Sequence, residues 1–314
     1  MAGVTIAIIG ARDIAKEFGK KGTASDVTLF NQVAVGHVIT CVEPTNFPEK
    51  IPPLFVTLGM ADRCLLVIDQ LSRPIAETIA VADLYDLPTA VVLGPAVGEE
   101  EVGRLLKGTR FESAPRSALD FPALRQLLDG WTPRVEEGPV TVPIDHSFPV
   151  KGVGAVALGV VRVGTLHAHE KLRLWPTPKL VEIRSIQVHD VEVPEASNGD
   201  RVGVALKGAD PDELARGQIL APEGSLHASA SLRGTDLVPC RYHRTPWGEG
   251  AQMHLAAGLQ VVPVSVGSRD DKQAFFTADR AVAFRPGQRA YVLDLSSTTG
   301  PRIAARVALQ DGPD

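Results

Sequence analysis

The sequence is poor in cysteine and in aromatic residues. It has three cysteines in 314 residues, and aromatic residues make up 5% of the chain. Cys41, Cys64 and Cys240 form no C-x-x-C pair, and an odd number without that spacing argues against a disulfide framework and against a zinc site. We therefore expect a reducing compartment, a cytoplasmic protein and no bound metal.

The chain also lacks long apolar runs and an excess of basic residues. No signal-peptide pattern is present, and the apolar stretch Val4–Ile9 has the length of a buried strand, not of a membrane helix. The formal net charge is −5, which gives no general attraction to nucleic acids or membranes. We expect no membrane and no DNA partner, and any RNA-binding surface must be a local patch.

What the chain does contain is a β-rich segment, Pro143–Leu220, in which short runs alternate with Gly, Pro, Asn and Asp. The expected strands are Ala155–Val163, Lys171–Trp175, Val181–His189 and Arg201–Leu206. This spacing predicts a small antiparallel barrel. The pattern Gly152-x-Gly154 is followed by no helical segment, so it is not a dinucleotide-binding fingerprint.

Four motifs in this segment resemble the second domain of translational GTPases such as EF-Tu and SelB. They are PIDHSFPVKGVGAVALGVV, VEIRSIQVHDVEV, NGDRVGVALKG and LARGQIL, in that order. The resemblance implies a P-loop-GTPase-like, doubly wound α/β domain over residues 1–137, followed by two all-β antiparallel barrels over 138–223 and 224–314. The second barrel would contain the β runs Leu255–Val266, Ala274–Thr277 and Ala290–Leu295.

The periodicity before residue 130 fits the α/β domain. Apolar strand-like runs and amphipathic helical runs follow one another there. The strands are expected at Val4–Ile9, Val38–Val42, Cys64–Ile68 and Thr89–Leu93, and the helices at Ile75–Tyr85, Glu99–Leu106 and Phe121–Leu128.

The motifs that bind a nucleotide in this family are altered. A working P-loop reads G-x-x-x-x-G-K-[ST], whereas GARDIAKEFGKKGT keeps only Gly10 in place. KKGTASDVTLF resembles the first switch of SelB through Gly22 and Asp26, but the metal-binding Thr falls on Ala24. The second-switch motif D-x-P-G-H falls on 43–47, EPTNF, and the guanine-reading N-K-x-D falls on 94–97, GPAV. We expect GTP and Mg²⁺ binding to be lost, leaving a pseudo-GTPase with no catalytic residues.

Archaeal SelB-like proteins, including a group called the pyrrolysine elongation factor, carry similar strings. The shared segments are Gly19–Asp26, Ile144–Gly152, Arg184–Val191 and His254–Val264. In EF-Tu-like factors the first barrel helps to hold the aminoacyl end of tRNA. The resemblance therefore points to a ligand site at Asp145, His146 and Phe148, with Leu158 replacing a family threonine.

Several of these residues also have plainer interpretations. Asp145 could cap a strand end, and Phe148 could belong to the barrel core. Arg162, Arg173, Lys179 and Arg184 could form a basic strip for phosphates, of which Arg184 is the preferred contact, or be scattered surface charges. Likewise Arg241–Trp247 could contact RNA or be an ordinary loop. His167 and His169 share a strand face but lack a third metal ligand.

The sequence therefore predicts an EF-Tu/SelB-like protein that does not hydrolyse GTP and that binds tRNA, other RNA or the ribosome. Two alternatives remain open at this stage. One is a GTP-binding elongation factor that delivers a specialised aminoacyl-tRNA through an unusual nucleotide loop. The other is a scaffold whose barrels contact a protein partner.

Overall fold

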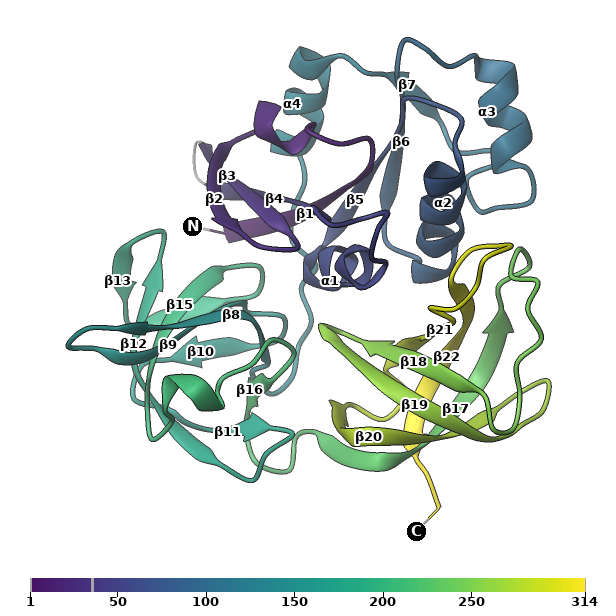
Figure 1. Cartoon of the computed structure of the whole chain (residues 1–314). Helices are drawn as coiled ribbons and strands as arrows, with labels where there is room; N and C mark the ends of the chain where they lie inside the picture. The colour runs from purple at the N-terminus through teal and green to yellow at the C-terminus, as the bar shows by residue number, and fades with distance from the viewer. Residues whose placement is uncertain (1, 35–36, 314) are drawn as a thin grey trace.

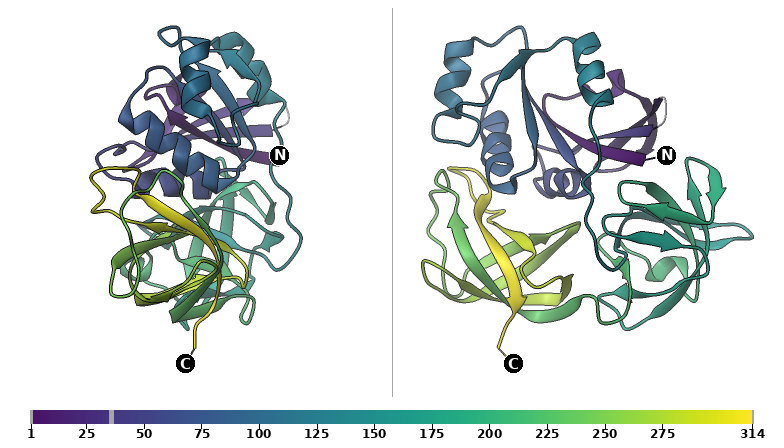
Figure 2. Two further views of the ribbon diagram at one scale, coloured as in Figure 1. Left: turned by 90° about the vertical axis from the view of Figure 1, so that its right-hand side faces the viewer. Right: turned by 180° about the vertical axis from the view of Figure 1, so that it is seen from behind.

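The computed structural model describes residues 2–34 and 37–313. The chain forms an α/β domain followed by two β-barrels, and the two barrels lie side by side beneath the α/β domain (Figure 1). Figure 2 shows the same arrangement from the side and from behind. Among the described residues, no helix has the length and apolar character needed to cross a membrane.

The first domain is built on one twisted sheet with the strand order β2-β3-β4-β1-β5-β6-β7. Central strands β1, β4, β5 and β6 run parallel and are almost entirely apolar, as expected for strands covered on both faces. The strands are β1 Ala2–Gly10, β2 Lys20–Ala24, β3 Thr28–Ala34, β4 His37–Glu43, β5 Arg63–Ile68, β6 Thr89–Leu93 and β7 Arg116–Ala118.

Helices cover both faces of this sheet. Side chains of α1 (Pro52–Met60), α2 (Arg73–Tyr85) and α3 (Glu99–Leu106) pack with Ala7, Ile9 and Leu66 on one face. Side chains of α4 (Phe121–Asp129) and the 3-10 turn η1 (Ala15–Glu17) pack with Ile6 and Ile8 on the other. Ser72 and Asp120 cap α2 and α4 by accepting hydrogen bonds from Ile75 N and Ala123 N, which fixes where these helices begin.

The first barrel, residues 142–221, closes by pairing β11 with β12 at the ends of the order β11-β16-β8-β9-β15-β12, and β13 extends it at one side. A short pair, β10–β14, lies beside it. Its strands are β8 Val142–Val150, β9 Gly154–Val160, β10 Thr165–His167, β11 Lys171–Trp175, β12 Leu180–Val188, β13 Val191–Val193, β14 Glu195–Ser197, β15 Arg201–Lys207 and β16 Ile219–Ala221, with the 3-10 turn η2 at Pro211–Glu213.

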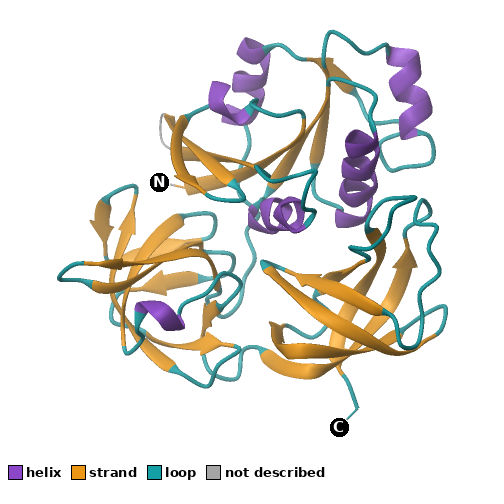
Figure 3. Cartoon of the chain, viewed as in Figure 1, coloured by secondary structure: helices purple, strands orange, loops and turns teal. Residues whose placement is uncertain are grey.

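The second barrel, residues 227–311, is closed in the order β17-β20-β19-β18-β21-β22. Its strands are β17 His227–Pro239, β18 Gln252–Ala257, β19 Gln260–Arg269, β20 Ala274–Phe284, β21 Arg289–Leu293 and β22 Ile303–Asp311. The expected single run Leu255–Val266 is wrong: Gly258 has a φ of 58° and turns the chain there, so the run becomes the hairpin β18–β19. Figure 3 shows α1–α4 confined to the first domain and strands dominating both barrels.

Each barrel contacts the first domain through specific side chains. Tyr291 of the second barrel stacks on Tyr85 of α2 with ring centroids 4.5 Å apart. Arg302 pairs with Glu77 of α2, with Nη2 and Oε2 2.5 Å apart. The two barrels also meet, because Trp175 and Ile219 of the first barrel share an apolar cluster with Ala283 of the second. Arg162 of the first barrel pairs with Asp62 of the first domain at 2.7 Å, so the first domain contacts both barrels.

Candidate functional site

The first candidate site is a cleft at the carboxyl ends of the central strands of the first domain, with a volume of about 690 Å³. Gly10 ends β1 and lines this cleft. Its φ of 99° lies in the left-handed region, and a Cβ would collide with the carbonyl oxygen of Val67, so only glycine fits here. Among the described residues between β1 and β2, the helical structure consists of the single turn η1.

Glu43, at the end of β4, reaches across to the loop after β1. Its Oε1 accepts hydrogen bonds from Ile14 N at 2.8 Å and from Ala15 N at 2.6 Å. Burial raises the pKa of Glu43, and the hydrogen bonds from these two amides offset part of that effect. The carboxylate thus occupies two backbone donors of the loop that follows Gly10.

The charges around this cleft are predominantly acidic. The charged side chains among its described lining residues are the acidic Asp13, Glu43, Glu49 and Asp69 and the basic Arg12 and Lys21. Arg12 is itself engaged, because its Nη2 donates to Phe47 O at 2.6 Å and pairs with Glu49 at 3.1 Å. A polyphosphate would therefore meet more negative than positive charge in this cleft.

The residues that the switch resemblance singled out do not gather at the cleft. Gly22 lies on β2 beside Asn31. Of Gly10, Gly22 and Asp26, the three residues that the sequence assigns to a remnant of the nucleotide site, only Gly10 lines the cleft. Asp26 instead binds Arg216 of the first barrel through two hydrogen bonds of 2.6 and 2.8 Å. Burial alone would raise the pKa of Asp26, but the hydrogen bond and charge of Arg216 bring it below its ordinary value.

Asp145 and His146 belong to the same contact between domains. Asp145 is 1% exposed and forms a two-point ion pair with Arg201 at 2.6 and 2.8 Å. Burial would raise its pKa, but the charge of Arg201 and the hydrogen bond from His146 lower it on balance. His146 contacts Asp145 through Nδ1 at 2.6 Å and Ser25 of the first domain through Nε2 at 3.0 Å. The Asp145 carboxylate is thus an internal ion-pair partner and not a strand cap.

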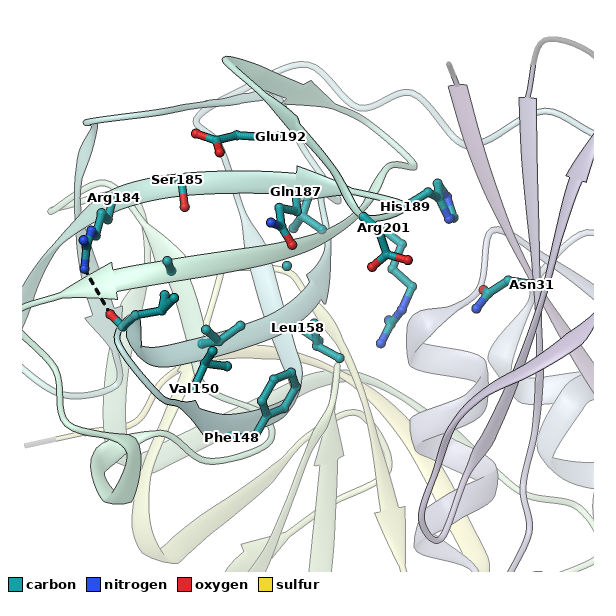
Figure 4. Close-up of a pocket in the computed structure, with 16 residues that line it drawn as sticks. Asn31, Phe148, Val150, Leu158, Arg184, Ser185, Gln187, His189, Glu192 and Arg201 are labelled. Atoms are coloured by element: carbon teal, nitrogen blue, oxygen red, sulfur yellow. Dashed lines mark hydrogen bonds between the residues drawn. The ribbon is translucent and has the colours of Figure 1, made fainter.

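The second candidate site is a pocket of about 750 Å³ on the outer face of the first barrel, next to Asn31 of β3 (Figure 4). Phe148 and Leu158 stand on its apolar side, and Phe148 is 42% exposed, so it is not a barrel-core residue. Arg184 of β12 is exposed and donates to Val153 O at 3.2 Å. The structure therefore places Phe148 and Arg184 on the wall of one pocket, with Asp145 and His146 outside it.

Polar residues that sequence reasoning missed complete the pocket wall. They are Asn31, Ser185, Gln187, His189, Asp190, Glu192 and Arg201. Arg201 connects Asp145 to the pocket that Phe148 and Arg184 line. Its side chain lines the pocket, and its guanidinium is held by Asp145. Burial lowers the pKa of His189, which favours the neutral imidazole on this wall. The pocket thus offers an aromatic and aliphatic side and a hydrogen-bonding side.

The four residues considered for a basic strip do not form one, because they have separate partners. Arg162 donates to Asp62 of the first domain at 2.7 Å, and Lys179 pairs with Glu213. Arg173 lies over the ring of Trp175 and donates to Thr177 O at 2.7 Å. Of the four, Arg184 is the one that lines the pocket.

The loop Arg241–Trp247, a candidate RNA contact, also joins domains. Arg241 donates to Gly108 O and Tyr242 to Lys107 O, both in the first domain. Trp247 is largely buried beneath Arg269, whose guanidinium carbon lies 4.1 Å from the ring centroid. This loop therefore fastens the second barrel to the first domain.

Among the described residues, no three His, Cys, Asp or Glu side chains are grouped closely enough to hold a metal ion.

Comparison with known proteins gives both sequence and structural relatives. Residues 154–221 match the family Elongation factor Tu domain 2. The chain is 33% identical over 300 residues to the uncharacterized protein MJ0325 of Methanocaldococcus jannaschii, covering 95% of this chain and 97% of that protein. It is 28% identical to the selenocysteine-specific elongation factor of the same organism, covering 83% of this chain and 61% of that protein. SelB of Methanococcus maripaludis, solved with the GTP analogue GPPNHP, superposes with a TM-score of 0.84 at 20% identity, covering 100% of this chain and 80% of that one.

Proposed function

This chain belongs to the EF-Tu/SelB-like family of translational GTPases, and we propose that it is a translation-factor-like protein that binds RNA through its first barrel without a guanine nucleotide. The expected RNA is tRNA, bound near its 3′ end, alone or at the ribosome. The observation that carries the proposal is the first-barrel pocket, which is lined by the exposed side chains of both Phe148 and Arg184.

The pocket has the chemistry that a terminal nucleotide or an aminoacyl group requires. An exposed aromatic ring gives a base or an apolar side chain a surface on which to stack, an interaction that tolerates different bases. The guanidinium of Arg184, which pairs with no acidic side chain in the described part of the chain, supplies a phosphate contact, and Gln187 and Arg201 supply hydrogen-bond donors. Asp145 acts indirectly in this scheme, by holding Arg201 in position.

The first-domain cleft supports the nucleotide-independent part of the proposal. The loop after Gly10 lacks the lysine and the hydroxyl residue of a P-loop at their required positions. Glu43 occupies two of the loop amides, and acidic residues outnumber basic ones on the cleft wall. A GTP-dependent factor would need the opposite arrangement of charge around the phosphates.

The proposal is tested by titrating labelled tRNA, with and without an aminoacylated 3′ end, against the parent protein and Arg184→Glu. We expect the variant to bind tRNA more weakly at every sequence tested, with a salt dependence lower by about one unit, as for one lost phosphate contact. Lys171→Glu is the matched control, because Lys171 is exposed on the same barrel but does not line the pocket.

Failure of this experiment would favour the scaffold alternative. If the parent protein does not bind tRNA, or if folded Arg184→Glu binds as well as Lys171→Glu, the barrel is not an RNA site. The first barrel would then be a surface for a protein partner.

A further inference from the structure

The loop that follows β1 is organised around a side chain of the protein itself. Ile14 and Ala15 direct their backbone N–H groups at the same oxygen, Oε1 of Glu43, over 2.8 and 2.6 Å. The loop after β1 and Glu43 at the end of β4 are neighbours because β1 and β4 pair in parallel and both end at this edge of the sheet. The contact therefore joins the ends of adjacent strands.

Consecutive backbone amides after a glycine are the arrangement with which P-loops cradle phosphate oxygens. Amides in such a loop need an acceptor, because a buried N–H without one is costly. In the family resemblance, Glu43 stands at the position of the metal-linked aspartate of the second switch. Glutamate has one more methylene group than aspartate, and here its carboxylate reaches the loop directly.

We propose that Glu43 is a resident internal anion that takes the place of a phosphate oxygen and fixes the loop from Ala11 to Ala15 in one course without a ligand. The proposal rests on the proposed function, in which the cleft binds no nucleotide, and it names what holds the loop instead. Ala11 N donates to Val67 O at 3.0 Å, and Arg12 Nη2 donates to Phe47 O at 2.6 Å. These contacts hold the start of the loop, and Glu43 holds its end.

The proposal predicts which loop amides become exposed when Glu43 is changed. Hydrogen exchange of the Ile14 and Ala15 amides is measured at pH 8 in the parent protein, Glu43→Gln and Glu43→Ala. Glu43→Ala removes the acceptor, so both amides should exchange about tenfold faster or more, whereas Glu43→Gln keeps an acceptor oxygen and should show a smaller change. Glu49→Ala is the control, because Glu49 lines the same cleft but contacts Arg12 and not these amides.

An external anion distinguishes a resident anion from a simple loop brace. Inorganic phosphate added to Glu43→Ala should slow the exchange of Ile14 and Ala15 again, and it should leave the parent unchanged. Unaltered exchange in Glu43→Ala, or no response of that variant to phosphate, overturns the proposal.

A separate titration of the parent with a fluorescent guanine nucleotide keeps the two proposals distinguishable. Saturable binding that is selective over adenine nucleotides would contradict the nucleotide-independent function. The hydrogen exchange of Ile14 and Ala15 in Glu43→Ala is measured without nucleotide, so it tests the internal anion independently of nucleotide binding.

Discussion

Arg162 of the first barrel donates a hydrogen bond from Nη1 to Oδ1 of Asp62 in the first domain, over 2.7 Å. Asp62 is 0% exposed, and its Oδ2 accepts from Thr5 N of β1 at 2.8 Å. Arg134 N, in the segment between the two domains, donates to Oδ1 at 3.3 Å. One carboxylate therefore connects the central sheet, the connecting segment and the first barrel.

The first prediction concerns this carboxylate. Asp62→Ala leaves the Arg162 guanidinium without its partner in a largely buried position, and we expect a loss of about 3–5 kcal/mol in the free energy of unfolding. Urea unfolding measures it, with exposed Asp271→Ala as a control expected to change by about 0.5 kcal/mol or less. A loss in Asp62→Ala no larger than that of the control would show that the contact carries little stability.

The second prediction is the pH dependence of the contact between Asp26 and Arg216. The pKa of Asp26 is lowered in the native protein, so its carboxylate stabilises the fold fully above the ordinary aspartate pKa of about 3.9. That contribution is lost as the pH falls through the lower native pKa. Because both side chains are partly exposed, we expect only about 1 kcal/mol.

The measurement compares unfolding free energies of the parent and Asp26→Asn from pH 7 downward. The difference should be constant near neutral pH and shrink below about pH 4. A difference that grows as the pH falls would contradict the assignment.

The third prediction has the opposite sign and concerns Glu43. Because burial raises its pKa, the native protein holds this proton more tightly than the unfolded chain, in which a glutamate titrates at about 4.3. The stabilisation that the bound proton of Glu43 gives the native protein is therefore complete below the pKa of the unfolded chain. It is lost as the pH rises through the raised pKa of the native protein. The stability of the parent relative to Glu43→Gln should fall as the pH increases through this window, and a rise would refute the prediction.

The fourth prediction uses the exposure of Phe148. Since the ring is 42% exposed, Phe148→Ala should cost far less stability than the roughly 3–5 kcal/mol typical of a core phenylalanine. Loss of one stacked base should nevertheless weaken tRNA binding by about 1–3 kcal/mol. Thermal unfolding and tRNA titration on the same preparation separate the two effects, and unchanged affinity in the folded variant would exclude a stacking role.

Much of the fold was readable from local pattern. The strand Thr89–Leu93 forms as expected because it is a short apolar run between turn residues. The helix Glu99–Leu106 forms as expected because its buried residues Val102 and Leu106 recur at helical spacing. Helix α1 was missed, because Pro52 and Pro53 begin it and its remaining residues are nearly all buried, which leaves no amphipathic pattern. The α/β domain with two barrels is confirmed by the structure and by its superposition on SelB.

The sites were harder to predict because their members are distant in sequence. Phe148 and Arg184 were found through family motifs, but Asn31 reaches the same pocket from another domain and carries no local signal. Arg216 and Asp26 are 190 residues apart, and no sequence pattern links them. Strand β12 is also irregular between Ile183 and Ser185, which allows Arg184, Ser185 and Gln187 to line one pocket despite the alternation expected of a strand.

The most direct test of the account is the dissociation constant for tRNA, measured in Mg²⁺ without nucleotide, with GTP and with GDP. A nucleotide that binds neither state of the protein cannot shift its equilibrium, so we expect three values that agree within about twofold. Binding that requires GTP, or that changes about tenfold or more between GTP and GDP, would contradict a nucleotide-independent translation-factor-like protein.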